Sequence, residues 1–370
     1  MRYKFLVLVA TAAIIQSCSR HDQQPVDTTD NWPTDSIRVL KSNLNFPWEI
    51  LWGKDNFIWM TERGGKISKI DPRTGEVVFS TTISDVVSNN EGGLLGMIQH
   101  PDFLKNGLFY VVYNYNSGST YLEKLVQLKF ANNNVQAVAT LIDKIPAAAN
   151  HNGSRLWITD EAVPKLFMTT GEATVQDNAQ LLSSLSGKVL RMNLDGSIPP
   201  DNPIPGSLVW SFGHRNPQGL VMANGILYES EHGPAIEDEV NIIEKNRNYG
   251  WPNVMGPCSD PGEIAFCTAN NVKEPIWSSG SVTFAGSGLD YYNNPRISGW
   301  QNSLLLAELK DACLRVLSLS ADGKAVNKVQ VFFKNRYGRL RDICVSPAGR
   351  VYLCTSNGGN ADVLVEISKP

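Results

Sequence analysis

The chain has 370 residues, of which 42% are hydrophobic and 19% charged, and its formal net charge is −3. This composition is typical of a soluble globular protein, the length allows two domains or one large repetitive β domain, and the charge gives no support for nucleic-acid binding. With 30 glycines and 20 prolines, the chain favours many short strands over long helices, which excludes a coiled coil and a collagen. Beyond the first twenty residues no apolar run is long enough to span a bilayer.

The first 18 residues have the pattern of an export signal. Arg2 and Lys4 precede an apolar run over residues 5–15 that is too short for a comfortable transmembrane helix. A small or polar stretch then leads to Cys18, as in a bacterial lipoprotein signal, although Gln16 makes the match loose. We expect Cys18 to carry lipid, residues 19–35 to be a polar tether, and the protein to lie in the bacterial cell envelope, in the periplasm or at the outer membrane, with the lipid as its only membrane contact. The alternative is plain secretion with Cys18 removed.

The remaining five cysteines divide into two groups. Cys258 and Cys267 flank a turn-rich segment, so a local disulfide is plausible in an exported chain. Cys313, Cys344 and Cys354 lie in apolar, strand-like runs and are expected to be buried packing residues. No Cys/His spacing indicates zinc.

A unit of short apolar strands separated by polar turns recurs six times, at a loose spacing of roughly 45–60 residues. Its strand-like runs are residues 48–52, 57–61 and 66–70, then 94–99, 108–113 and 124–130, then 155–159, 166–170 and 188–194, then 219–222, 226–229 and 239–243, then 288–292, 303–308 and 313–319, and finally 341–346, 351–355 and 363–367. Residues 36–40 are also strand-like and could close a ring as the outer strand of the last unit.

This repetition predicts an all-β fold, a six-bladed β-propeller of four-stranded antiparallel blades over residues 36–370. No alternation of strand and helix indicates a doubly wound fold. The competing architecture is a pair of two-sheet sandwiches.

Several polar loop motifs are too specific to serve packing alone. They comprise residues 47–48, 61–65, 92–96, 100–103, 151–156, 183–191, 213–220, 231–234, 238–241, 248–252 and 339–342. In this order they resemble the motifs of the soluble quinoprotein glucose/sorbosone dehydrogenases, the PQQ-dependent aldose sugar dehydrogenases. The resemblance extends over residues 46–367.

The residues themselves suggest an acid–base group and an anion site. His151 opens a loop before a strand, where it could act as a general base near neutral pH. Arg215, Lys310, Arg339 and Arg341 could converge on the central funnel of a propeller, and strand alternation would point both Arg339 and Arg341 the same way. Converging cations require an anionic ligand, which suits PQQ, a tricarboxylate.

The resemblance implies a role for each motif residue. His151 would take the proton from the anomeric hydroxyl of an aldose while hydride passes to PQQ, which gives a lactone. Arg215 would polarise the quinone carbonyl, and Asn216 would orient the quinone. Lys310, Arg339 and Arg341 would hold the cofactor carboxylates. The carbonyls of Gly233 and Pro234 would bind Ca²⁺ against the quinone. The reduced cofactor would pass electrons to an external acceptor of quinone or cytochrome type in the envelope.

Two positions depart from the family pattern. Glu91 stands where the family has a glutamine that touches the quinone, and a carboxylate there would repel the cofactor unless it is protonated, paired with arginine or turned away. Asn150 precedes His151, at a position where the family commonly has an aspartate or another polar residue. An asparagine can orient the imidazole but cannot stabilise imidazolium by charge.

Two other functions fit a propeller. One is a calcium-dependent, lactonase-type hydrolase, which would need carboxylate and asparagine ligands around the ion and no cluster of cations. The other is a non-catalytic lipoprotein that binds carbohydrate or a partner, for which Glu91 is the best support. The sequence allows a monomer or a homodimer.

Overall fold

The computed structural model describes residues 32–33 and 35–369. The predicted signal segment 1–18, with Cys18, and most of the predicted tether lie outside the described residues. No helix in the described part of the chain is long and apolar enough to cross a membrane.

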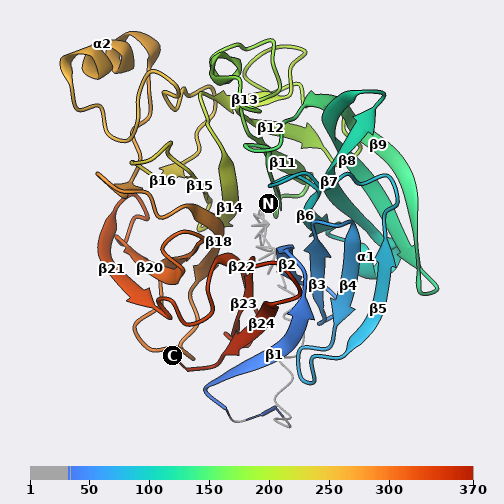
Figure 1. The fold of residues 1–370 in the computed structure, drawn as a ribbon. Coiled ribbons are helices and arrows are strands. Elements are labelled where there is room, and N and C mark those ends of the chain that lie inside the picture. The colour runs from blue at the N-terminus through green and yellow to red at the C-terminus, as the bar shows by residue number, and fades with distance from the viewer. Residues whose placement is uncertain (1–31, 34, 370) are drawn as a thin grey trace, which may run out of the picture. The chain divides into compact units, whose positions relative to one another are not determined.

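Six four-stranded antiparallel sheets follow one another around a ring (Figure 1). The first two are β2 (Pro47–Trp52), β3 (Ile58–Glu62), β4 (Lys66–Ile70) and β5 (Val77–Thr82), then β6 (Leu94–Gln99), β7 (Leu108–Ser117), β8 (Thr120–Ala131) and β9 (Asn134–Pro146). The next two are β10 (Gly153–Ile158), β11 (Lys165–Thr170), β12 (Lys188–Asn193) and β13 (Val209–Phe212), then β14 (Pro217–Ala223), β15 (Ile226–Glu231), β16 (Glu239–Ile242) and β17 (Trp277–Ser278). The last two are β18 (Gly286–Tyr292), β19 (Ser303–Glu308), β20 (Cys313–Leu319) and β21 (Val326–Phe332), then β22 (Leu340–Val345), β23 (Val351–Thr355), β24 (Asp362–Ile367) and β1 (Ile37–Leu44). The predicted six-bladed propeller is confirmed.

The ring closes through the strand expected to close it. β1 pairs antiparallel with β24, with Ile37 opposite Ile367 and Val39 opposite Val365. The first strand of the described chain therefore lies in the same sheet as the last, which joins the two ends of the ring.

The hydrophobic core lies between neighbouring blades. Trp59 of the first blade, for example, packs in one cluster with Phe109 and Val111 of the second. The inner strands β2, β6, β10, β14, β18 and β22 contact one another around the channel, and most of their residues are buried. The outermost strands are half exposed: in β5 every second residue is open to solvent.

Two short α-helices and one 3₁₀ turn interrupt the strands: α1 (Phe103–Asn106), α2 (Pro261–Asn270) and η1 (Gln176–Ala179). α2 lies in the insertion between β16 and β17, where Asp260 caps it by accepting from the amides of Gly262 and Glu263. Cys258 and Cys267 form the expected disulfide. Cys313, Cys344 and Cys354 are buried free cysteines, as predicted.

Antiparallel pairing brings the functional motifs to one end of the ring. Each inner strand begins beside the end of its second strand: Pro47 pairs with Glu62, Pro217 with Glu231 and Gly286 with Glu308. Loops that precede inner strands and loops that follow second strands therefore share one face. Most of the predicted site residues lie on such loops.

Candidate active site

His151 lies two residues before β10, in a backbone conformation that few non-glycine residues adopt (φ 61°). Its carbonyl accepts a hydrogen bond from the amide of Ala173 at 3.0 Å. Its Nδ1 is 2.7 Å from Oε1 of Glu172, a buried carboxylate. With Nδ1–H donating to that carboxylate, Nε2 is the ring nitrogen that is left to accept a proton from a substrate. The side chain is 19% exposed, so substrate can reach it.

Glu172 corrects the expectation drawn from Asn150. Asn150 does not hold the imidazole, because its Oδ1 accepts from Nδ2 of Asn90 at 2.5 Å. The charge that would stabilise imidazolium comes instead from Glu172, two residues beyond β11. The sequence alone gives no signal for this pair, because it depends on a close approach of two backbones: a Cβ at Gly171 would lie 2.0 Å from the carbonyl oxygen of His151.

Arg215 and Asn216 lie directly before β14, and hydrogen bonds to neighbouring loops and strands hold them in place. The amide of Arg215 donates to Oε2 of Glu231 at 2.7 Å, and its Nη1 donates to the carbonyl of His232 at 3.2 Å. Its carbonyl accepts from the amide of Glu172 at 2.9 Å, which ties Arg215 to the partner of His151. Asn216 is fully buried and accepts from the amide of Gly153 at 3.2 Å.

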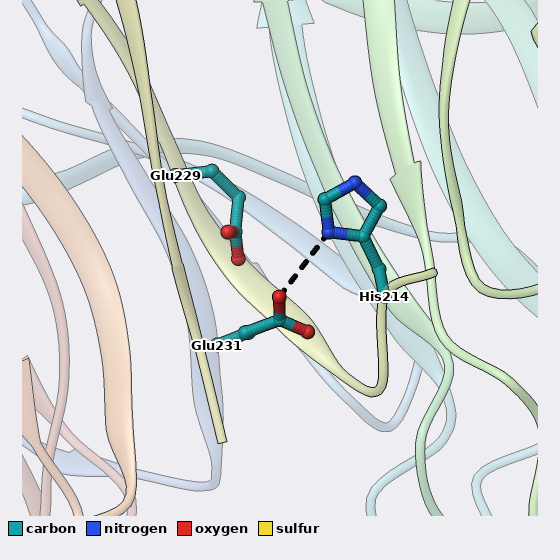
Figure 2. A group of neighbouring side chains, drawn as sticks. All are labelled: His214, Glu229 and Glu231. Carbon is teal, nitrogen blue, oxygen red and sulfur yellow. Dashed lines mark hydrogen bonds and ion pairs between the residues drawn. The ribbon is translucent and has the colours of Figure 1, made fainter. Parts of the chain in front are cut away.

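A buried acidic group supports this loop. Figure 2 shows Glu231 between Glu229 and His214, whose Nδ1 is 3.2 Å from Oε1 of Glu231. Nδ2 of Asn241 donates to Glu229 at 3.2 Å and to Glu231 at 3.3 Å. Burial raises the pKa of Glu229 well above its ordinary value, and the charge of Glu231 raises it further. Glu231 is therefore the group that holds both His214 and the backbone of Arg215.

Basic side chains converge at this end without carboxylate partners. Arg341 is 2% exposed and donates to Oε1 of Gln218 at 2.6 Å and to Oγ of Ser287 at 3.1 Å. Burial lowers its pKa to about 10. Among the buried nitrogens that have no hydrogen-bond partner in the described part of the chain, those of Arg63, Arg215, Arg341 and His232 lie at this end. Unpaired buried donors are costly, so this group fits a ligand with several anionic oxygens.

Glu91 faces these cations as an ionised carboxylate. Burial alone would raise its pKa, but the charges of His232 and Arg341 outweigh burial, and the pKa is lowered. Its Oε2 accepts from the amide of His151 at 3.3 Å and from Nδ2 of Asn216 at 3.5 Å. From the sequence, Glu91 could avoid repelling the cofactor in three ways: protonation, pairing with an arginine, or turning away. The lowered pKa rules out protonation. A close ion pair with Arg215 or Arg341 is absent among the described interactions.

Two predicted cofactor residues at the same end of the ring are exposed rather than buried. Lys310 follows β19 and has an exposed side chain, and the described residues record no contact between it and the other predicted residues. Arg339 is exposed directly before β22, whereas Arg341 is buried. The pairing register shifts between Leu340 and Asp342, so simple alternation does not describe this pair. Arg63 and His232 were missed as site residues, although both lie within the recognised motifs.

The turn at Gly233 and Pro234 is built around Asp238. Oδ1 of Asp238 accepts from the amide of Gly233 at 2.9 Å, and Oδ2 accepts from the amide of Ala285 at 2.8 Å. A side chain is excluded at Gly233, because a Cβ would lie 1.8 Å from the carbonyl oxygen of Ile236. A hollow of about 10 Å³ beside this turn is also lined by Glu237 and Glu239, which is room for one water-sized particle.

Comparisons with known proteins agree with this geometry. The family model described as glucose/sorbosone dehydrogenase matches residues 44–365. The chain is 31% identical to quinoprotein glucose dehydrogenase B of Acinetobacter calcoaceticus, over 87% of this chain and 86% of the relative. It is 29% identical to the aldose sugar dehydrogenase YliI of Escherichia coli, over 87% and 90% of the two chains.

One similar protein has been solved with a bound cofactor. The PQQ-bound form of an aldose sugar dehydrogenase from Streptomyces coelicolor superposes with a TM-score of 0.75 at 30% identity, covering 91% of this chain and 99% of that one. The chain therefore belongs to the glucose/sorbosone dehydrogenase family, and the family and enzyme class predicted from its motifs are confirmed.

Proposed function

We propose that the protein is a PQQ-dependent dehydrogenase that oxidises the anomeric carbon of aldose sugars to a lactone and passes the electrons to an external acceptor in the cell envelope. One observation carries the proposal: the His151–Glu172 pair, with Nδ1 2.7 Å from the carboxylate, lies beside buried basic side chains, each of which has a nitrogen without a hydrogen-bond partner among the described residues.

In this proposal His151 is the general base. Nε2 receives the proton of the anomeric hydroxyl, and the buried carboxylate of Glu172 stabilises the imidazolium that results. Arg215 lies next to the pair through its bond to the amide of Glu172, where its charge would favour negative charge developing on a bound quinone oxygen. When bound, PQQ supplies the two-electron acceptor for the hydride that leaves the sugar carbon.

The remaining cations would hold the cofactor. Arg63 and Arg341 present buried, unpaired Nε atoms, and a tricarboxylate would satisfy them with charge-assisted hydrogen bonds. Lys310 and Arg339 are exposed at the same end of the channel and would reach only the outer part of the ligand. Asn216 would orient the quinone, as the family pattern implies.

We place Ca²⁺ at the turn of Gly233 and Pro234. Backbone carbonyls and carboxylates are the oxygen ligands that this ion prefers, and Oε2 of Glu237, which lines the hollow, is buried without a hydrogen-bond partner in the described residues. Removal of Ca²⁺ by a chelator should release PQQ and lower the melting temperature of the PQQ-loaded protein. An equal melting temperature with and without both ligands would contradict this site.

The direct test is reconstitution. Purified protein is loaded with PQQ and Ca²⁺, and reduction of a dye is followed with several aldoses and, as the control, with sorbitol, which has no anomeric carbon. Aldose-dependent reduction and a lactone product are expected. Hydrolysis of lactones with Ca²⁺ alone would favour the lactonase, and sugar binding without dye reduction would favour a carbohydrate-binding lipoprotein.

We further propose that the mature protein is lipid-anchored through Cys18. The support is the sequence pattern alone, since this residue lies outside the described part of the chain. Cys18→Ala should move the protein from the membrane fraction to the soluble fraction or leave it unprocessed, because the several acyl chains of a lipoprotein anchor far more firmly than one. Equal membrane fractionation of variant and wild type would contradict the anchor.

A further inference from the structure

The central channel has a second opening, at the end opposite the proposed cofactor site. The site residues precede the inner strands, but a cavity of about 460 Å³ is lined by residues at or just beyond the other ends of these strands, among them Trp52, Gln99, Trp157 and Asp160. A six-residue strand is about 20 Å long, so the two openings are separate places. The cavity has the size of a small-molecule site.

A buried ion layer forms the floor of this cavity. Nη1 of Arg155 is 2.7 Å from Glu49 and 3.0 Å from Asp342, and its Nε donates to the carbonyl of Gln218 at 2.8 Å. Arg155, Glu49 and Asp342 all line the cavity. Because these side chains are buried and bonded to one another, they separate the cavity from the group around Arg341.

Two buried donors in the lining lack a protein partner. Nη2 of Arg155 and Nε2 of Gln99 have none among the described residues, and the two side chains are 3% and 5% exposed. The other end of the Gln99 amide is fixed, since Oε1 accepts from the amide of Lys54 at 2.7 Å. The Gln99 side chain is thus held in one orientation with a free donor. Such a donor calls for an acceptor from a ligand.

The walls add aromatic surface and acceptors. Trp52 and Trp157 are partly exposed, and Trp52 is held by stacking on Tyr352 at 5.8 Å between ring centroids. Asp160 is exposed at the mouth, and Asp290 is partly exposed in the lining. Indole faces suit the apolar faces of ring compounds, and the carboxylates can accept from hydroxyl groups.

The charged groups that line the cavity indicate which class of ligand it can bind. The ionisable groups in the lining are Lys54, Arg155, Glu49, Asp160, Asp290 and Asp342. An anion is disfavoured, because Arg155, the buried cation of the lining, is already paired with Glu49 and Asp342. Burial raises the pKa of both carboxyl groups and raises the pKa of Asp290 to about 7, so the four carboxyl groups do not count as four full charges.

A cation is disfavoured as well, because the buried carboxylates already have partners. Arg155 pairs with Glu49 and Asp342, and the backbone amides of Tyr291 and Val345 donate to Asp290. The buried groups of the lining that lack a partner among the described residues, on Gln99 and Arg155, are donors.

We infer that this opening is a second binding site, for a neutral polyhydroxylated small molecule such as a cyclic polyol or a pyranose. The hydroxyl oxygens accept from Gln99 and Arg155, a hydroxyl hydrogen bonds to Asp160 at the mouth, and the ring lies against tryptophan. The inference does not depend on the proposed oxidation, since none of these residues belongs to the proposed cofactor site.

The test uses polyols without an anomeric carbon. Binding of myo-inositol and of sorbitol to the full-length protein is measured by ligand-observed NMR and calorimetry, with and without PQQ, and gluconate and choline serve as ionic probes. We expect the neutral polyols to bind equally in both forms and both ionic probes to bind more weakly. Absence of polyol binding, which would mean that water alone fills the cavity, or tighter binding of either ionic probe, would overturn the inference.

Variants locate the site. Gln99→Glu keeps the acceptor for the amide of Lys54 but removes the free donor, so the fold should persist while polyol affinity falls about tenfold. Trp157→Leu should also weaken binding. Gln136→Leu, on the exposed strand β9, is the matched control and should bind as wild type does. All three should reduce dye normally when loaded with PQQ. Unchanged polyol affinity in both cavity variants would place binding elsewhere and overturn the inference.

Discussion

Arg155 and Arg341 are both buried arginines on inner strands, yet their surroundings differ in one respect. Arg155 on β10 has two carboxylates within 3.0 Å, and although burial alone would lower its pKa, Asp342 and Glu49 raise it. Arg341 on β22 bonds only to neutral groups, and burial lowers its pKa to about 10. A buried charge that the fold neutralises serves the fold, whereas one left unneutralised indicates an anionic ligand.

The same comparison extends to the two ends of the channel. Around Arg341, several guanidinium groups and an ionised Glu91 lie close together with unpaired donors. Around Arg155 the charges are paired and only two donors are free. The first end is suited to a polyanion held next to a general base, and the second to a neutral ligand. Substitutions at the two ends should therefore separate activity from stability.

The largest effect is expected at the general base. His151→Gln should lower the rate of aldose-dependent dye reduction by about 10²–10⁴-fold, while PQQ still raises the melting temperature, because the cationic side chains are untouched. Glu172→Gln should give a smaller loss, since the imidazole keeps a hydrogen-bond partner but loses the charge that stabilises imidazolium. Dye reduction near the wild-type rate in His151→Gln would contradict the assignment of the base.

Replacement by methionine should affect a different property at each arginine: the free energy of unfolding at Arg155, and the affinity for PQQ at Arg341. Arg155→Met leaves Glu49 and Asp342 buried without a cation and should cost about 3–5 kcal/mol of unfolding free energy. Arg341→Met removes a charge that has no ion pair within 4.0 Å among the described residues and interacts with Glu91 only at longer range, so it should change that free energy by no more than about 1 kcal/mol, but PQQ affinity should fall at least about tenfold. Urea unfolding and PQQ titration of both variants measure the two quantities. Similar losses of stability in both variants would remove the distinction.

A third case is a buried carboxylate without a cation. Glu123 is 1% exposed, its Oε2 accepts from Oγ of Ser154 at 2.7 Å, and burial raises its pKa to about 8. The folded state therefore keeps a proton between about pH 4.5 and pH 8 that the unfolded chain has released. The stabilising contribution is complete below the unfolded pKa and is lost as pH rises toward 8.

Glu123→Gln removes this titration. Relative to wild type, the variant should gain unfolding free energy as pH rises through that window, by at most about 1.4 kcal/mol per pH unit. Glu229 and Glu239, whose pKa values are also raised by burial, act in both proteins and drop out of the comparison. Urea unfolding at about pH 5 and about pH 8 tests the slope. An equal difference at both pH values would mean that Glu123 does not titrate there.

The fold was largely predictable because the three inner strands of each blade are apolar and bounded by turns. The outermost strands gave a weaker signal, apart from β1: β5 has three apolar and three polar residues, and every second side chain is exposed to solvent. The two-residue strand β17 is separated from β16 by an insertion, residues 243–276. No repeat spacing predicts an insertion of this length.

The sequence predicted the site residues that belong to recognisable motifs. It did not predict the residues whose role depends on contacts between distant parts of the chain. His151, Arg215, Asn216 and Arg341 lie together as expected. Glu172 could not be ranked above other glutamates, because its role depends on a close approach of two backbones at Gly171. The register shift beside Arg341 likewise depends on pairing between β22 and β23, which local alternation does not encode.

The smallest and most informative change concerns Glu91, a carboxylate that faces Arg341 and His232 in the proposed cofactor site. Two carboxylate charges 4 Å apart repel by about 4 kcal/mol at an effective dielectric constant of 20, and the neighbouring arginines reduce that value. Glu91→Gln should therefore tighten PQQ binding by up to about tenfold. The cofactor-free protein should become slightly less stable, since the lowered pKa shows that His232 and Arg341 stabilise the ionised form.

The pH dependence follows from the same direction of shift. A depressed folded-state pKa means that Glu91 contributes stability above its unfolded pKa and loses it as pH falls through the folded value. Between about pH 5 and pH 8 Glu91 stays ionised, so the ratio of PQQ affinities of variant and wild type should be constant there and shrink only in stronger acid. PQQ titration of both proteins at two pH values decides the matter. Weaker binding in Glu91→Gln at both values would show that Glu91 positions Asn216 and His151 for the cofactor, and that this positioning outweighs the repulsion.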